Sequence, residues 1–325
     1  MIEVKHAPKS VVEDGCPILG SFDQSIENVN IFDMKSHWPQ FIRNMRLKEW
    51  EAFQLANEDY FILGAIYDIK IATINILVIY DRRLKKVHKF QETAFLKKAK
   101  LSKGLRKTTN EFKIKEFDFK IDNNIQEGSI KIGIKIKDQV AIDVEFTNVN
   151  DPLVVVMPFS PKHILYSHKE IMKASGKMIL CGEENVFGEG AIGIIDDHKG
   201  QYPYNMKYNW VTGCIMDQGK VQGFNLTKNQ IINQEIYNEN CLWFDGKVKT
   251  LPPVEFELFK DKWLIKDKEG LVNIKFILEN SFGINIKAGL VAVDYTAPFG
   301  LFEGQIAGQK IDGFFGMGED KKYRM

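Results

Sequence analysis

Strict alternation of apolar and polar residues is the feature that most constrains this fold. The stretch Ile130–Lys137 reads IKIGIKIK, so every second residue is an isoleucine and the residues between are lysine or glycine. Residues i and i+2 of a β-strand share a face, and this period of two predicts a strand with one buried face. The run Val140–Thr147 repeats the pattern after a turn. Several short strands at about ten-residue spacing predict a meander, a sandwich or a barrel.

The most apolar window, Tyr60 to Tyr80, is long enough to raise the question of a membrane helix. It contains Asp68, Lys70 and Asn75, and charges at the depth of a bilayer are costly. We therefore predict two buried strands with a turn near Asp68, and no membrane span.

Helical signals are few, and the best are two short segments, Glu92–Leu101 and Ser167–Ala174. The dipeptide Asp245-Gly246 lies between two strand-like runs and predicts a tight hairpin, because its glycine can adopt a positive φ. We expect an N-terminal β-rich unit at residues 1–160, a connecting segment at 161–190 and a second β unit at 191–325.

Charge and cysteine content restrict the function. The 44 Lys+Arg residues nearly balance the 43 Asp+Glu residues, which argues against a nucleic-acid binder with a basic face. The start of the chain has no apolar signal segment, and the four cysteines show no zinc or redox spacing. We predict a cytoplasmic, reduced protein whose oligomeric state the sequence leaves open.

Two motifs that suggest cofactors do not fit their contexts. Gly188–Gly193 reads GEGAIG, a literal G-x-G-x-x-G, but it leads into a strand-like run and not into a helix. His163 and His168 are five residues apart, which fits no strong zinc pattern. We predict neither a cofactor nor a metal.

The segment Ile194–Trp210, IIDDHKGQYPYNMKYNW, places ionisable residues directly before a dense run of aromatics. If alternation continues across Gly200, Asp196 and His198 share a face with the rings of Tyr202 and the residues that follow it. A carboxylate and an imidazole beside an aromatic pocket have shifted pKa values and can exchange protons with a bound apolar molecule. The alternative interpretation is a polar turn between two strands whose rings are ordinary core.

Candidate site residues follow from this segment and from NENCLWFDGK, Asn238–Lys247. The catalytic candidates are Asp196, Asp197 and His198, and the sequence leaves open which aspartate faces the pocket. Glu319, in GMGED near the end of the chain, is a further acid or an exposed tail charge. The ligand-binding candidates are Lys199, Tyr202, Tyr204, Tyr208, Trp210, Asn225, Glu239, Asn240 and Trp243.

The motifs VVVMPFSPKHILYSHKEIMKASGKM, DDHKGQYPYNMKYNW, GFNL, NENCLWFDGK and GMGED resemble a bacterial family known only as a domain of unknown function. The likeness runs from about Trp50 to the C-terminus and is densest from Val154 to Lys249. It implies no established activity.

The chain is more distantly similar to the AttH and carotenoid-hydratase group, which has two lipocalin-like β units. That group carries a Gly-x-x-x-(Trp)-x-Asp-His/Arg-Glu element, and its counterpart here is GAIGIIDDHKG. The tryptophan position is Gly193 or Ile194, and the glutamate position is Lys199. In the hydratase branch an acid protonates an isoprenoid double bond and water adds. With these two departures, the resemblance mainly implies an apolar cavity near this loop.

The sequence thus predicts an all-β protein with two lipocalin-like barrel or sandwich units and few short helices. We expect a lipophilic or aromatic small molecule to bind in the second unit or in the cleft between units. One hypothesis is an acid–base enzyme, a hydratase or isomerase, with Asp196 as the acid and His198 as its partner. The others are a non-catalytic carrier or sensor of a lipophilic molecule, and a structural or interaction module with a filled core.

Overall fold

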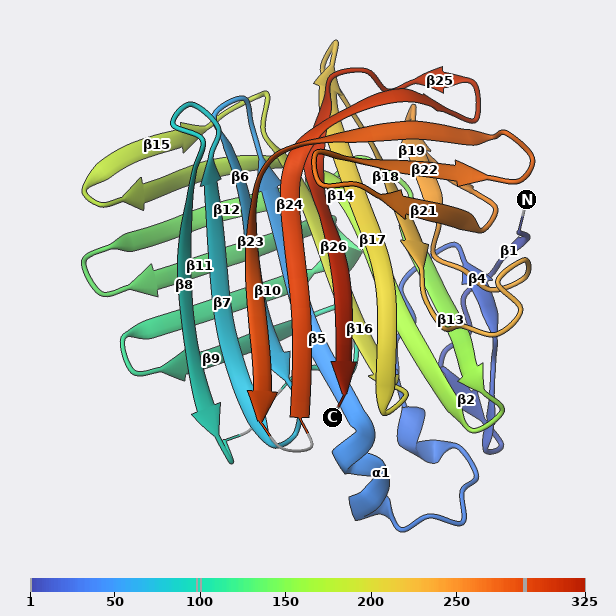
Figure 1. Ribbon diagram of the computed structural model, residues 1–325. Coiled ribbons are helices and arrows are strands. Elements are labelled where there is room, and N and C mark those ends of the chain that lie inside the picture. The colour runs from blue at the N-terminus through green and yellow to red at the C-terminus, as the bar shows by residue number, and fades with distance from the viewer. Residues whose placement is uncertain (1, 98, 100, 289–290, 325) are drawn as a thin grey trace.

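Two large curled β-sheets make up the protein, as Figure 1 shows for the computed structural model. The structure describes residues 2–97, 99, 101–288 and 291–324. Within this described part, α1 (Gln40–Arg46) is the one α-helix, and η1 (Ile31–Asp33) and η2 (Ile125–Glu127) are short 3₁₀ turns. The prediction of an all-β fold with two lipocalin-like units is confirmed.

The first sheet holds most strands of the N-terminal two-thirds. Its main strands are β5 (Leu47–Ala56), β6 (Tyr60–Asp68), β7 (Ala72–Asp81), β8 (Lys86–Phe95), β9 (Thr108–Ile114), β10 (Phe117–Asn124), β11 (Ser129–Ile136), β12 (Val140–Asn148), β14 (His163–Leu180) and β16 (Ile192–Gln201). They are hydrogen-bonded in the order β8-β7-β6-β5-β16-β14-β12-β11-β10-β9. Strands β9–β12 run across β5–β8 in Figure 1, so the sheet folds over its own inner face.

Shorter strands extend this sheet. They are β1 (Val4–Lys5), β4 (Gly20–Phe22), β13 (Leu153–Ser160) and β15 (Glu183–Phe187), while β2 (Val12–Glu13) and β3 (Cys16–Pro17) form a separate pair. Strand β13 lies between β14 and β4, so the first residues of the chain pack on the edge of the first sheet.

The second sheet is formed by the C-terminal strands. These are β17 (Asn205–Asp217), β18 (Lys220–Lys228), β19 (Cys241–Phe244), β20 (Lys247–Thr250), β21 (Val254–Leu258), β22 (Lys262–Asp267), β23 (Val272–Ala288), β24 (Val291–Ile306), β25 (Gln309–Lys310) and β26 (Phe314–Arg324). Their order is β20-β19-β18-β17-β26-β24-β23-β22-β21, with β25 beside β24. The predicted hairpin at Asp245-Gly246 joins β19 and β20, and both residues have positive φ.

Buried apolar side chains form four clusters: a layer inside each curled sheet, a layer between the two sheets, and a smaller cluster where the N-terminal segment packs on β13 and β14. Phe53 and Phe146 lie inside the first sheet, and Phe224 and Phe302 lie inside the second. Strands such as β6 and β16, which lie at the contact between the sheets, bury both of their faces, so their alternate side chains fill two layers at once.

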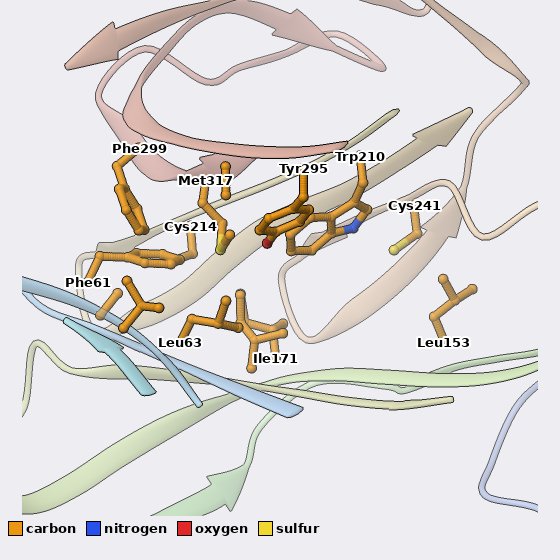
Figure 2. Close-up of a cluster of buried hydrophobic side chains, with 14 of the residues drawn as sticks. Phe61, Leu63, Leu153, Ile171, Trp210, Cys214, Cys241, Tyr295, Phe299 and Met317 are labelled. Carbon is orange, nitrogen blue, oxygen red and sulfur yellow. The ribbon is translucent and has the colours of Figure 1, made fainter. Parts of the chain in front are cut away.

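The layer between the sheets is closely packed at its apolar end. Tyr80 of the first sheet stacks on Phe299 of the second, with ring centroids 5.0 Å apart. Figure 2 shows Phe61, Leu63 and Ile171 facing Phe299 and Met317 across this layer. These contacts hold the two sheets together and leave the other end of the same layer to the polar groups described below.

Both predicted helices are wrong. Ser167–Ala174 lies inside β14, and residues 92–95 of the other segment end β8; of its remaining residues, 98 and 100 lie outside the described residues. In each case a charged or polar pattern resembled a helical one, but pairing with neighbouring strands decided the structure. The turn near Asp68 is confirmed, since β6 ends at this residue.

The change from one sheet to the other comes between Gln201, the end of β16, and Asn205, the start of β17. Residues 161–190, expected to connect two units, contain β14 and β15 of the first sheet; the division into domains stays a prediction. All four cysteines are free. No helix in the described ranges is long and apolar enough to cross a bilayer.

Candidate functional site

Strand β16 sends alternate side chains to opposite faces of the first sheet. Ile194 and Tyr202 belong to the apolar layer between the sheets, whereas Ile195 belongs to the inner layer of the first sheet. Asp196 and His198 share the parity of Ile194 and point between the sheets. The prediction that they share a face with Tyr202 is confirmed, and the site lies in the contact between the two sheets.

Strand pairing places one row of side chains across this face. His198 lies opposite Ser167 of β14 on one side and opposite Trp50 of β5 on the other, and Trp50 in turn lies opposite Tyr67 of β6. Directly opposite residues of antiparallel strands are close neighbours. The row is therefore fixed by the register of four strands.

The imidazole of His198 is the centre of a buried polar cluster. Its Nε2 lies 3.0 Å from Asp196 Oδ1, 2.8 Å from Ser167 Oγ and 3.5 Å from Glu239 Oε2. Its Nδ1 lies 3.2 Å from the hydroxyl of Tyr202. Ser167 Oγ donates a hydrogen bond of 2.9 Å to Glu239. Together with Lys169, these residues form what we call the interlayer cluster: Ser167, Lys169, Asp196, His198 and Glu239.

Lys169 neutralises the two carboxylates of the cluster. Its Nζ lies 2.7 Å from Asp196 Oδ1 and 3.8 Å from Glu239 Oε2. It also lies 3.2 Å from His198 Nε2. Lys169 and a protonated imidazole would together balance the charges of the two carboxylates, so the cluster is close to neutral in that state.

The charges set the protonation states. Burial raises the pKa of Asp196, but Lys169 and His198 outweigh burial and hold that pKa well below its usual range. For Glu239 burial again raises the pKa, and Lys169 and His198 lower it to about 2. Burial lowers the pKa of His198, yet the attraction of Asp196 leaves it raised. The charges therefore favour ionised carboxyl groups and a protonated imidazole in the cluster.

Aromatic rings cover the imidazole. Trp50 stacks on His198 with centroids 4.5 Å apart, and its other side is stacked on Tyr67 at 4.7 Å. Tyr202 stacks on Trp50 at 5.6 Å and meets Phe159 at 5.1 Å. These rings exclude water from most of the imidazole and present π faces beside its proton.

The second sheet adds a carboxylate held by tyrosines. The hydroxyls of Tyr208 and Tyr295 each donate a hydrogen bond of 2.6 Å to Glu319. Lys321 Nζ lies over the ring of Tyr208 at 5.7 Å and over that of Tyr67 at 5.3 Å. The sequence allows Glu319 to be either a further acid of the site or an exposed charge of the tail. In the structure it faces the same layer as His198.

Solvent reaches this layer from one side. The side chain of Asp196 is 13% exposed, and Trp50, Tyr67, Tyr208 and Glu319 are partly exposed. Two surface hollows, of about 500 and 330 Å³, are lined by other residues, including Asp122 and Lys220 respectively. A ligand of the interlayer cluster would approach at the partly exposed edge.

The other face of β16 carries a separate charged set inside the first sheet. Lys199 Nζ lies 2.6 Å from Asp197 Oδ1, and both side chains are almost fully buried. Asn110 donates a hydrogen bond to Glu51, which lies directly opposite Asp197. Burial, and then repulsion by Asp197, raises the pKa of Glu51 to about 8. We call these four residues the inner cluster; His168 and Glu170, 3.4 Å apart, lie on the same face.

The predicted site residues are thus divided between these places. Asp196, His198, Tyr202 and Glu239 come together, whereas Asp197 and Lys199 lie on the inner face. Asn225 supports the cluster, since its amide accepts from Trp210 Nε1 at 2.6 Å and donates to the backbone carbonyl of Glu239 at 2.6 Å.

The remaining ligand-binding candidates have other contacts. Asn240 is buried and bonds the backbone of Thr227 and Pro252. Trp243 is fully buried and donates to the carbonyl of Asp151. Tyr204 is exposed at the β16–β17 turn.

Four residues of the site, Ser167, Lys169, Trp50 and Tyr67, were not predicted from the sequence. Ser167 and Lys169 lie in Ser167–Ala174, the segment that the sequence predicts as a helix. In strand β14 the period of two places both side chains on one face. Trp50 and Tyr67 enter the site through strand pairing, which no local pattern specifies. In the described residues no group of three or more His, Cys, Asp or Glu side chains could hold a metal ion.

Comparisons with known proteins address the family and the fold. A family model described as "Domain of unknown function (DUF2804)" matches residues 1–325. A comparison with curated proteins finds no significant match to the chain.

Several solved structures share the fold. CghA, in a crystal structure with Sch210972, is similar with a TM-score of 0.58 and 10% identity, covering 98% of this chain and 97% of that chain. Kievitone hydratase from Nectria haematococca has a TM-score of 0.55 and 11% identity, covering 84% and 88%. A protein assigned as AttH from Nitrosomonas europaea has a TM-score of 0.49 and 14% identity, covering 88% and 96%.

Proposed function

The chain belongs to the DUF2804 family, and from that premise we propose that it is an acid–base enzyme of the hydratase or isomerase type. In this proposal the substrate is a lipophilic or aromatic small molecule, and the enzyme is cytoplasmic. The observation that carries this proposal is the imidazole of His198, which lies between two ionised carboxylates and flat against Trp50. The fold shared with CghA and kievitone hydratase supports it as an analogy only.

His198 is the proton donor in this proposal, in place of Asp196. An acid whose pKa lies far below neutrality holds no proton at neutral pH, whereas a histidine with a raised pKa holds one that it can give. Asp196 and Glu239 stabilise the imidazolium and fix its orientation.

The reaction is then either the addition of water to a double bond or the shift of that double bond to a new position. His198 Nε2–H protonates one carbon of a double bond, and the positive charge that develops on the next carbon faces the rings of Trp50 and Tyr202. In a hydratase, water adds to that carbon and its extra proton returns to the neutral imidazole. In an isomerase, the substrate loses a different proton to the same imidazole. Either way the histidine ends each cycle protonated.

Burial explains why such chemistry would be efficient here. The side chain of His198 is 7% exposed, so its interactions with Asp196 and Glu239 are little screened by water. Solvent enters beside Asp196, which is where a water molecule for addition would arrive.

A pull-down followed by isotope labelling tests the proposal. Purified protein is incubated with an extract of lipophilic metabolites, and retained molecules are identified by mass spectrometry. The extract is then treated with the protein in ¹⁸O-labelled and deuterated water. We expect a bound molecule that gains labelled water or exchanges a carbon-bound proton, and a rate lowered about 10²–10⁴-fold in His198→Asn.

His163→Asn is the matched control, because His163 lies on β14 away from the cluster and contacts Ser160 at 3.0 Å. It should keep the full rate. A molecule retained by both proteins without any labelling would instead make the protein a carrier. If nothing is retained and nothing is labelled, the layer is a filled core and the proposal is wrong.

A further inference from the structure

One end of the molecule exposes an unusual number of large apolar side chains. On α1 and just before it, Trp38, Phe41 and Met45 are 61%, 68% and 58% exposed. None of the residues of α1 is buried. Phe41 and Met45 are four residues apart and share a helix face, so this short helix turns its apolar side to solvent.

Neighbouring turns continue the same surface. Lys48 Nζ donates to the carbonyls of Met45 and Ile69, at 3.1 and 3.0 Å, and so ties the end of α1 to the β6–β7 turn. The amide of Leu96 donates to the carbonyl of Ile71 at 3.0 Å. Figure 1 shows α1 and the end of β8 at the same end of the molecule. We call this surface the apolar end: Trp38, Phe41, Met45, Ile71, Phe95 and Leu96, all exposed.

Positive charges outnumber negative ones around the apolar end, where exposed Asp33 precedes Lys35. The segment Lys35–Arg46 contains Lys35, Arg43 and Arg46 and no aspartate or glutamate. Glu49, which follows this segment, and Asp68, at the β6–β7 turn, are both paired with Lys70. A partner that meets this surface therefore encounters apolar side chains bordered by cations.

We propose that the apolar end docks onto the surface of an anionic lipid bilayer. Tryptophan and phenylalanine partition into the boundary between head groups and acyl chains, and lysine and arginine beside them attract anionic head groups. Contiguous exposed apolar surface of this kind marks an interaction site in a protein. The charge border favours an anionic lipid surface over a second copy of the chain, whose own apolar end would be equally basic.

This docking would place the interlayer cluster near the lipid. Trp50 follows α1 by four residues, and Arg46 donates a hydrogen bond of 3.0 Å to the carbonyl of Tyr202. If the proposed function holds, a lipophilic substrate could pass from the bilayer to His198 without crossing bulk water. The docking itself does not depend on that function.

Co-sedimentation with vesicles tests the proposal. The full chain is spun with vesicles of phosphatidylcholine alone, or of equal parts phosphatidylcholine and phosphatidylglycerol. We expect binding to the anionic vesicles, and at least about tenfold weaker binding for the triple variant Trp38→Ser, Phe41→Ser, Met45→Ser. Lys35→Gln should weaken binding about fivefold, the loss expected for one interfacial charge.

A second triple variant, Leu84→Ser, Val186→Ser, Ile236→Ser, is the matched control. Its three side chains are similarly exposed but lie elsewhere, so it should bind as the wild type does. Equal loss in both variants, or no sedimentation of the wild-type chain with anionic vesicles, overturns the proposal. So does a dimer in solution that the first triple variant dissociates, because the apolar end would then be covered by a second copy.

Discussion

The two faces of β16 carry the same kinds of residue in different settings. On the face toward the second sheet, Asp196 pairs with Lys169 at 2.7 Å, and its side chain is 13% exposed. On the inner face, Asp197 pairs with Lys199 at 2.6 Å, and neither side chain is more than a few per cent exposed. The interlayer face has His198 and stacked rings at a partly exposed edge, whereas the inner face, which also carries a histidine, His168, is closed to solvent.

The difference separates a structural charge pair from a candidate site. A buried aspartate and lysine satisfy each other and need nothing further. Both clusters hold two carboxyl groups and one lysine. In the inner cluster, burial and Asp197 raise the pKa of Glu51 and so favour its neutral form, whereas in the interlayer cluster the imidazole of His198 supplies a second cation for Asp196 and Glu239. Burial alone therefore does not identify the site. What distinguishes it is a titratable imidazole that is paired with two carboxylates at a partly exposed edge.

The largest expected effect is on the sealed face. Lys199→Met leaves Asp197 buried without its cation, and should lower the free energy of unfolding by about 4 kcal/mol. Urea denaturation at neutral pH measures this. Adding Asp197→Leu to the same chain should recover most of the loss, and a double variant as unstable as the single one would contradict the assignment of a simple ion pair.

Glu51 of the inner cluster should give a pH-dependent stability. Its pKa is raised from 4.5 to about 8 in the folded protein, so the folded chain keeps a proton that the unfolded chain releases between these values. The stability of the wild type should therefore fall by several kcal/mol in all as pH rises through this window. Glu51→Gln removes the titration, and unfolding measured from pH 5 to pH 9 should show a flatter profile for the variant.

Lys169→Met is the counterpart of Lys199→Met on the interlayer face. Asp196 and Glu239 keep the imidazolium of His198 as a partner, and Asp196 is partly exposed, so the loss should be smaller, about 2 kcal/mol. The same variant should raise the pKa of His198, since Lys169 lowers it. If Lys169→Met and Lys199→Met lowered the free energy of unfolding equally, the proposed difference between the interlayer face and the inner face would be wrong.

The smallest effect is expected at the edge of the layer. Tyr208→Phe removes one of the two hydroxyls that donate to Glu319, and should cost about 1 kcal/mol. Tyr295→Phe serves as the comparison, because its hydroxyl makes the equivalent bond. A thermal melt of both variants measures the difference from the wild type.

Local patterns predicted what depends on alternation alone. The parity of Asp196, His198 and Tyr202 could be read from the chain because a strand repeats every two residues. The partners of His198 could not, because Ser167, Trp50 and Glu239 reach it through strand pairing and sheet contact across long sequence separations.

The same limit explains the two wrong helices, and it explains why we propose His198 in place of Asp196 as the acid. Residues 167–174 carry mixed charges that satisfy a helical period, but β14 buries both of its faces, and its charged residues are paired within two different layers. The sequence predicts Asp196 as the acid because it shares a strand face with His198 and the aromatic run, where desolvation and the neighbouring imidazole shift its pKa. Lys169, which the sequence did not place beside it, shifts that pKa in the opposite direction.

The most direct test is the titration of His198 by nuclear magnetic resonance, in the wild type and in Asp196→Asn. The account predicts a pKa above 6.5 in the wild type and a clearly lower value in the variant, since attraction to Asp196 is what outweighs burial. A pKa of His198 below 6.5 in both proteins would contradict the assignment of His198 as the proton donor.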